Sequence, residues 1–153
     1  SERFGFAGSV QQTISISNDT IDFVLTLSTD AERMPGQVGW HPWFARPCRI
    51  ETDFAQMYVR DSDGIPSGEV VSPPAGPYDD CFTGARKPPK IIFDESITVQ
   101  IDSDCSHWVV YDQPEHAICV EPQSGPPDGF NLAPFIITRD KPLSRFMRLT
   151  ITK

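Results

Sequence analysis

The sequence predicts an all-β fold, an antiparallel β-sandwich, on three observations. Short segments alternate polar and apolar residues, which in a strand places the apolar side chains on one face. No window carries a sustained helical period. Fifteen prolines and ten glycines fall between the alternating segments, which suits short strands joined by stiff loops. We expect the 153 residues to form one sandwich domain that spans positions 1–153.

The N-terminal region predicts a hairpin with one buried side. Residues 13–17 and 20–28 both alternate polar and apolar residues, and Asn18 and Asp19 between them are turn formers. The second segment places four apolar side chains on one face, namely Ile21, Phe23, Leu25 and Leu27.

Further strands follow along the chain, separated by proline-rich and glycine-rich stretches. Their predicted ranges are 57–60, 91–93, 96–101, 107–111, 117–121, 135–138 and 145–152. In the last range Met147, Leu149 and Ile151 share a face. The proline-rich stretches 73–77 and 87–89 are expected to be loops within the fold, because strand patterns continue on both sides. Loops on a rigid sheet commonly carry functional residues, so we expect the site among them.

The charge balance limits the partners of the protein. Thirteen basic and 21 acidic residues give a formal net charge of −8, which disfavours nucleic acid and anionic membranes because both need a basic face. No apolar stretch approaches the roughly 18 residues that a membrane span requires. Residues 1–4 lack the basic segment, followed by an apolar one, that begins a signal peptide. We therefore expect a cytoplasmic protein.

Four scattered cysteines predict neither a zinc site nor a disulfide framework. Cys48, Cys81, Cys105 and Cys119 form no CxxC pair, whereas zinc sites use closely spaced ligands. An even count leaves disulfide pairing open, although a chain of this length does not depend on it. We expect free thiols and no metal.

Glu121 is the most informative single residue. It closes the apolar run 117–120 and precedes Pro122, so it stands at the mouth of a predicted buried strand. A buried carboxylate is unfavourable unless it is paired or hydrogen-bonded, and charged side chains whose pKa is shifted by burial are often functional residues. The alternative is a strand-end glutamate that reaches water.

A second candidate is His41, which lies in the run Gly-Trp-His-Pro-Trp-Phe at 39–44. Trp40 and Trp43 flank it, and aromatic faces commonly receive the C–H face of a sugar or another flat ligand. Histidine exchanges protons near neutral pH, so His41 is a candidate acid or base. The alternative is a core histidine with one satisfied hydrogen bond.

A third polar group is the run Pro-Tyr-Asp-Asp-Cys-Phe-Thr-Gly at 77–84. Adjacent carboxylates in a strand point to opposite faces, so at most one of Asp79 and Asp80 would enter a given pocket. The alternative is a solvated turn in which an aspartate caps local N–H groups. The sequence contains no GxSxG elbow, no HExxH pair and no phosphate-binding glycine loop.

Together, the three runs resemble the aldose 1-epimerase (galactose mutarotase) family in order and spacing. They are His-Pro-Trp-Phe, Tyr-Asp-Asp-Cys-Phe and Val-Glu-Pro-Gln-Ser-Gly-Pro-Pro-Asp. The resemblance extends from about Phe6 to Ile151 and covers only the C-terminal half of a family member. It implies a β-supersandwich and an enzyme that interconverts the α and β anomers of a free sugar without a cofactor.

The resemblance also implies roles for the candidate residues. His41 matches the general acid that protonates the ring oxygen, and Glu121 matches the general base that deprotonates the C1 hydroxyl. Asp79 corresponds to an aspartate that binds sugar hydroxyls, and Trp40 and Trp43 are expected to line the pocket.

The chain departs from the family because the N-terminal half of a member is absent. We therefore expect a companion polypeptide or self-association, since half a sandwich exposes apolar faces and open edges. Two other interpretations of the function stay open, namely a sugar-binding module without catalysis and a glycoside hydrolase that uses Glu121 and Asp79. A phosphorylated hexose would require an arginine cluster, for which Arg46 and Arg86 are the candidates.

Overall fold

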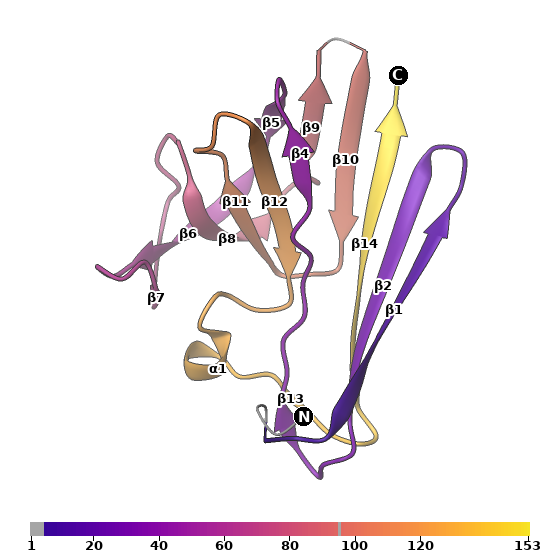
Figure 1. Ribbon diagram of the computed structural model, residues 1–153. Coiled ribbons are helices and arrows are strands. Elements are labelled where there is room, and N and C mark those ends of the chain that lie inside the picture. Colours follow the sequence, from indigo (N-terminus) through magenta and orange to yellow (C-terminus); the bar gives the residue numbers. More distant parts are fainter. Residues whose placement is uncertain (1–4, 95) are drawn as a thin grey trace.

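The computed structural model describes residues 5–94 and 96–153 and is built almost entirely from antiparallel strands (Figure 1). One sheet runs in the order β1 (Gly8–Ile16), β2 (Thr20–Thr29), β14 (Leu143–Thr152), β10 (Ile97–Ser103), β9 (Lys90–Phe93) and β5 (Arg49–Glu51). The second runs in the order β4 (Trp43–Ala45), β12 (Ala117–Gln123), β11 (His107–Tyr111), β8 (Asp79–Ala85), β6 (Phe54–Arg60) and β7 (Pro66–Val71). A short ribbon joins β13 (Ile136–Ile137) to β3 (Met34–Pro35). The predicted all-β sandwich is confirmed.

The alternation read from the sequence sets the two faces of the first sheet. β1 pairs with β2 as the predicted hairpin, and β14 pairs with the other edge of β2. Phe23 and Met147 lie opposite each other on the inner face. On the outer face, the Arg148 Nε atom lies 2.5 Å from the Asp22 Oδ1 atom. The inner face is therefore mainly apolar and the outer face mainly polar, with Val24 and Phe146 as an exposed apolar pair on the outer face.

The core lies between the two sheets. Ile91 and Ile101 of the first sheet meet Phe82, Trp108 and Val120 of the second, and all five are almost fully buried. A smaller cluster below it closes the base of the molecule and consists of Met34, Val38, Ile137 and Leu143. These contacts hold β12, which carries Glu121, in the middle of a packed layer.

The second sheet does not cover the whole first sheet. Val10, Ile14 and Ile16 of β1 lie on the inner apolar face, yet their exposed fractions are 65%, 51% and 76%. Figure 1 shows the hairpin of β1 and β2 extending beyond the second sheet. The β1 part of this apolar face is thus open to solvent, whereas Phe23, Leu25 and Leu27 of β2 pack against the core.

Several elements differ from the prediction. The sequence did not indicate β3, β4, β5, β7 or β8, and the predicted range 135–138 narrows to Ile136–Ile137. β7 begins at Pro66 and lies at a sheet edge. Proline lacks a backbone N–H, and an edge strand tolerates this because one of its sides forms no hydrogen bonds to a neighbouring strand. A single helical turn, α1 (Gly129–Leu132), lies where no helix was expected. Residues 1–4, on which the signal-peptide expectation rests, lie outside the described residues.

Within the described ranges 5–94 and 96–153, no helix has both the length and the apolar character needed to cross a membrane.

Candidate active site

β12 places Glu121 on the outer face of the second sheet. Along this strand Ile118 and Val120 point into the core, so the alternate residues Cys119, Glu121 and Gln123 point outward. β12 is flanked by β11 on one side and by the three-residue strand β4 on the other. Its outward side chains are consequently fixed by neighbours on both edges.

The segment before β4 brings His41 over the same strand. Gly39 forms an antiparallel bridge with Gln123, and the Trp40 N–H donates a hydrogen bond to the Pro122 carbonyl at 3.1 Å. A Cβ atom on Gly39 would lie 2.9 Å from that carbonyl oxygen. Glycine at this position therefore permits the close approach that delivers His41 to the site.

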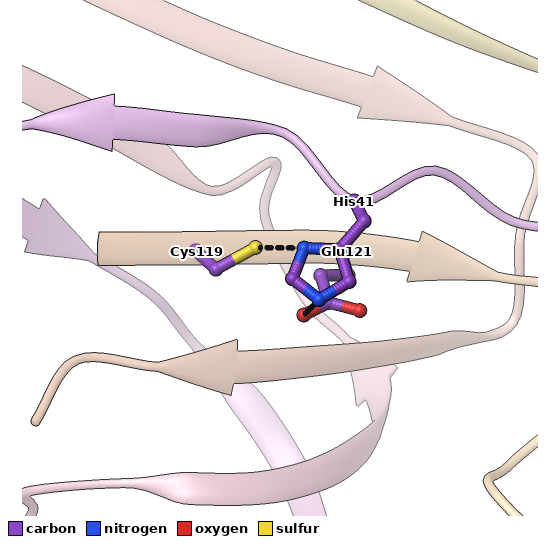
Figure 2. A group of neighbouring side chains, drawn as sticks. All are labelled: His41, Cys119 and Glu121. Atoms are coloured by element: carbon purple, nitrogen blue, oxygen red, sulfur yellow. Dashed lines mark hydrogen bonds and ion pairs between the residues drawn. The ribbon is translucent and has the colours of Figure 1, made fainter. Parts of the chain in front are cut away.

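His41 and Glu121 are in direct contact (Figure 2). The His41 Nε2 atom lies 3.1 Å from the Glu121 Oε1 atom, and the other carboxylate oxygen accepts a hydrogen bond from Gln123 Nε2 at 3.1 Å. The His41 side chain is 58% exposed, whereas that of Glu121 is only 7% exposed. Glu121 is thus a buried, paired carboxylate and not a strand-end glutamate that reaches water.

Cys119 contacts the other nitrogen of the same imidazole. Its Sγ atom lies 2.9 Å from His41 Nδ1 and 2.9 Å from the Pro42 carbonyl oxygen. Burial, with the nearby Glu121 carboxylate, raises the pKa of the Cys119 thiol above its usual value, so the thiol stays protonated at neutral pH.

Potential metal-ligating atoms of His41, Cys119 and Glu121 lie within 4.8 Å of one another. The imidazole, however, stands between the sulfur and the carboxylate, with one ring nitrogen facing each (Figure 2). An imidazole binds a metal ion through the lone pair of one ring nitrogen, so the sulfur and the carboxylate would have to lie on the same side of the ring to share that ion. Because they lie at opposite nitrogens, the arrangement suits a chain of hydrogen bonds better than a metal chelate.

Aromatic rings extend the site along the sheet edge. The Trp43 indole stacks on His41 with a centroid distance of 5.4 Å and on His116 at 6.3 Å. The Tyr111 ring meets it edge-on at 5.9 Å. Trp43 is 48% exposed, so one large aromatic surface beside the His41–Glu121 pair is available to a ligand.

A cavity of about 450 Å³ opens beside the pair, within the roughly 300–1,000 Å³ typical of small-molecule sites. Its lining residues are Gln37, Val38, Gly39, Trp40, His41, Glu121, Gln123, Asp128, Gly129 and Phe130. Trp43, which was also expected to line the pocket, is not among them, because it stacks on His41 farther along the sheet edge. The cavity combines the His41–Glu121 pair, of which Glu121 is buried, with aromatic walls and amide groups, which suits a small polyhydroxylated molecule.

Asp79 lies farther away on the same sheet. It faces Tyr111 across β8 and β11, and Tyr111 faces Cys119 across β11 and β12, which places the Asp79 and Cys119 backbones about 10 Å apart. Asp79 does not line the cavity. Its Oδ2 atom lies 3.3 Å from Arg60 Nη1, and Asp80 Oδ1 lies 2.9 Å from Arg60 Nε. Both carboxylates therefore reach one guanidinium, although adjacent strand residues were expected to point apart.

Sequence reasoning missed three residues that complete this surface. Cys119 and Gln123 lie two positions before and after Glu121, and this strand spacing was the signal that could have indicated them. Arg60 carried no such signal, because a register shift between Tyr58 and Arg60 decides where its side chain lies.

The two arginines considered for a phosphate lie elsewhere. Arg46 donates hydrogen bonds to the Pro114 and Asp112 carbonyls, at 3.0 and 2.6 Å. Arg86 Nη1 lies 2.8 Å from Asp53 Oδ1. Neither lines the cavity beside His41, so no arginine cluster of residues 5–94 and 96–153 faces it.

The same fold occurs in several solved structures. A galactose mutarotase-like protein from Clostridium acetobutylicum superposes with a TM-score of 0.79 over 97% of this chain, at 17% identity. A provisionally assigned aldose 1-epimerase from Escherichia coli K12 gives 0.79 over 95%, at 16% identity. A GalM/aldose epimerase homologue from C. elegans gives 0.78 over 97%, at 11% identity. The chain has the galactose mutarotase-like fold.

This galactose mutarotase-like chain spans 57%, 60% and 61% of the lengths of the Clostridium, Escherichia and C. elegans proteins. No protein-family profile and no curated protein matches the sequence. Identities of 11–17% establish a shared fold, so the activity has to be argued from the site. The fold implied by the three sequence motifs is confirmed.

Proposed function

We propose that the chain carries the acid–base pair of an aldose 1-epimerase-type isomerase, which interconverts the α and β anomers of a free hexose. The observation that supports this is the 3.1 Å contact between His41 Nε2 and Glu121 Oε1 beside a cavity, on a galactose mutarotase-like fold. His41 is the general acid and Glu121 the general base.

The proposed reaction is a ring opening followed by reclosure. The Glu121 carboxylate takes the proton of the C1 hydroxyl while the His41 imidazolium protonates O5, and the C1–O5 bond breaks to give an open-chain aldehyde. Rotation about C1–C2 presents the other carbonyl face. Reclosure returns the proton from O5 to His41 and from Glu121 to O1, so each group acts once as acid and once as base.

The close spacing of the pair suits this chemistry. The two oxygens that exchange protons, O1 and O5, are bonded to the same carbon, so the acid and the base must work a short distance apart. His41 is the more exposed partner and its ring can be displaced by an incoming sugar, whereas Glu121 is held by β12 and by Gln123. The sugar would insert between the two side chains at the cavity.

We assign Trp43 and Trp40 to the apolar face of the sugar. Trp43 offers an exposed indole that stacks on His41, and Trp40 lines the cavity. Asp79 is assigned to a distal hydroxyl, since it lies on the same side of the sheet as Glu121.

The decisive experiment measures anomer exchange by polarimetry on freshly dissolved hexoses. Glu121→Gln and His41→Asn are each expected to lower the rate by about 10²–10⁴-fold, because each removes a positioned proton-transfer group. Glu115→Gln, in an exposed turn, and His107→Asn are the matched controls. Near-normal exchange in either test variant would remove that residue from the mechanism.

We further propose that a complete site requires the portion of the fold that this chain does not span. The neighbours are longer, and the hairpin of β1 and β2 exposes the apolar residues Val10, Ile14 and Ile16. A further layer on this face would come from a longer polypeptide, a companion chain or a second copy. Anomer exchange should therefore be assayed with and without the remaining portion of the fold. Full activity of a strictly monomeric chain of 153 residues would contradict this proposal.

A sugar-binding module without catalysis is the second candidate, favoured by the exposed stack of His41, Trp43 and His116. Calorimetric binding of a hexose without anomer exchange in the complete assembly would support it. A glycoside hydrolase using Glu121 and Asp79 fits less well, because Asp79 is two strands away and paired with Arg60, outside the cavity.

A further inference from the structure

The hydrogen bonds around the Cys119 sulfur can be assigned from donor and acceptor chemistry alone. The sulfur has two partners at 2.9 Å, the Pro42 carbonyl oxygen and His41 Nδ1. A carbonyl oxygen only accepts, so the single S–H of the thiol must point toward Pro42 if that contact is a hydrogen bond. The sulfur then has only lone pairs to offer to His41, and Nδ1 must supply the proton.

This assignment determines the hydrogen-bonding role of both ring nitrogens of His41. With Nδ1–H donated to sulfur and Nε2–H donated to Glu121 Oε1, His41 is an imidazolium paired with a carboxylate. We infer that Cys119 is a positioning residue, whose sulfur accepts the Nδ1 proton and leaves Nε2 as the nitrogen that delivers a proton at the cavity.

The same contact serves His41 when the ring is neutral. Because the proton that exchanges with the sugar leaves from Nε2, Nδ1 keeps its proton and the Cys119 sulfur remains its acceptor in both states. A carboxylate in the same place would favour the imidazolium more strongly than a neutral thiol does. Since mutarotation uses His41 once as acid and once as base, a neutral acceptor that fits both states suits it; this catalytic meaning rests on the proposed function.

The Glu121 carboxylate is a second acceptor available to the S–H of Cys119, and a thiol that donates to it also offers only lone pairs to His41 Nδ1. Cys119 is fully buried, and its raised pKa keeps the S–H bond intact. The charged or titratable groups in contact with His41 are Glu121 and Cys119, both from β12. On its own segment His41 stacks on Trp43, beyond which lie His116 and Tyr111.

The test is a ¹H–¹⁵N NMR study of the histidine rings in the 153-residue chain, which contains only three histidines. Assignment comes from the signals lost in His41→Asn. In the unsubstituted protein the Nδ1–H of His41 is expected as a slowly exchanging signal, because its acceptor is buried. Cys119→Ala should abolish that signal, and Cys119→Ser, which keeps one donor and two lone pairs, should restore it.

Cys105→Ala, which removes another buried thiol, is the matched control and should leave the signal intact. Absence of an Nδ1–H signal in the unsubstituted chain, or an unchanged signal in Cys119→Ala, would overturn the inference. The unsubstituted spectrum decides the question even if a variant fails to fold. The readout needs no sugar, so failure of the proposed isomerase activity would be seen separately, in the polarimetric assay.

Discussion

β1 and β14 flank the same strand, β2, and have the same alternating pattern, yet their apolar side chains differ in solvent exposure. In β14, Leu143 and Met147 are 1% and 2% exposed. In β1, Ile14 lies opposite the same β2 residue as Met147, namely Phe23, but is 51% exposed. The difference comes from the opposing layer, which covers β14 at Leu143 and Met147 but leaves the apolar side chains of β1 exposed, although Trp40 reaches β1 through a hydrogen bond from Nε1 to Gln12 Oε1.

The comparison separates two kinds of information in an alternating sequence. Alternation decides which face a side chain occupies, because successive residues of a strand point to opposite sides. Whether that face is buried depends on a second layer, which is specified elsewhere in the sequence. The following predictions test this difference, beginning with the largest expected effect.

Met147→Ala should destabilise the fold far more than Ile14→Ala. Met147 is buried between the sheets, and removing such a side chain typically lowers the free energy of unfolding by about 2–5 kcal/mol. The exposed Ile14 should change it by less than about 0.5 kcal/mol. Urea denaturation of both variants measures the difference. Equal losses would mean that β1 is covered in solution.

Gly39→Ala should destabilise the second sheet, because residue 39 packs closely against the backbone of β12. The added Cβ atom would lie 2.9 Å from the Pro122 carbonyl oxygen, so the segment carrying His41 must move away from β12. Such overpacking typically lowers the free energy of unfolding by about 1–3 kcal/mol. Ala45→Ser, at an exposed position of β4, is the control and should stay within about 0.5 kcal/mol. An equally small effect of Gly39→Ala would show that the segment tolerates displacement.

His107 should make the stability of the covered layer depend on pH. Burial lowers the pKa of His107 below its ordinary value of about 6.5, so the unfolded chain binds this proton more tightly than the folded one. The stabilising contribution is complete above about pH 6.5 and is lost as the pH falls through the lowered pKa of the folded state. His107→Asn should flatten the profile of unfolding free energy between pH 5 and 7.5, and His116→Asn, in an exposed turn, should not. Parallel profiles for all three proteins would contradict this.

The smallest effect on stability is expected from Ile16→Lys on the open side. Ile16 is 76% exposed, so the unfolding free energy should change by less than about 0.5 kcal/mol. Self-association should weaken, because a charge interrupts the apolar face. Ser15→Lys, on the polar face of the same strand, is the control. Sedimentation velocity over a range of concentrations measures the effect, and unaltered association in Ile16→Lys would exclude this face.

The sequence was sufficient to predict which face each apolar residue of the long strands occupies and to select the principal candidate site residues. His41 and Glu121 were selected from local context, and the structure brings them into contact. Asp79 was selected with them but lies two strands away, because its place depends on how β8 joins the sheet. Arg60 could not be anticipated, since a register irregularity determines its contact with Asp79.

The indole of Trp43 stacks with the His41 and His116 imidazoles and is the most exposed of the three tryptophans of the chain. Protonation of either ring brings a positive charge against the indole face, which perturbs its excited state. Trp108 is buried in the core and provides a constant background. The protein thus contains its own fluorophore at the site, and its emission should register both titration of the neighbouring histidines and arrival of a ligand without any added label.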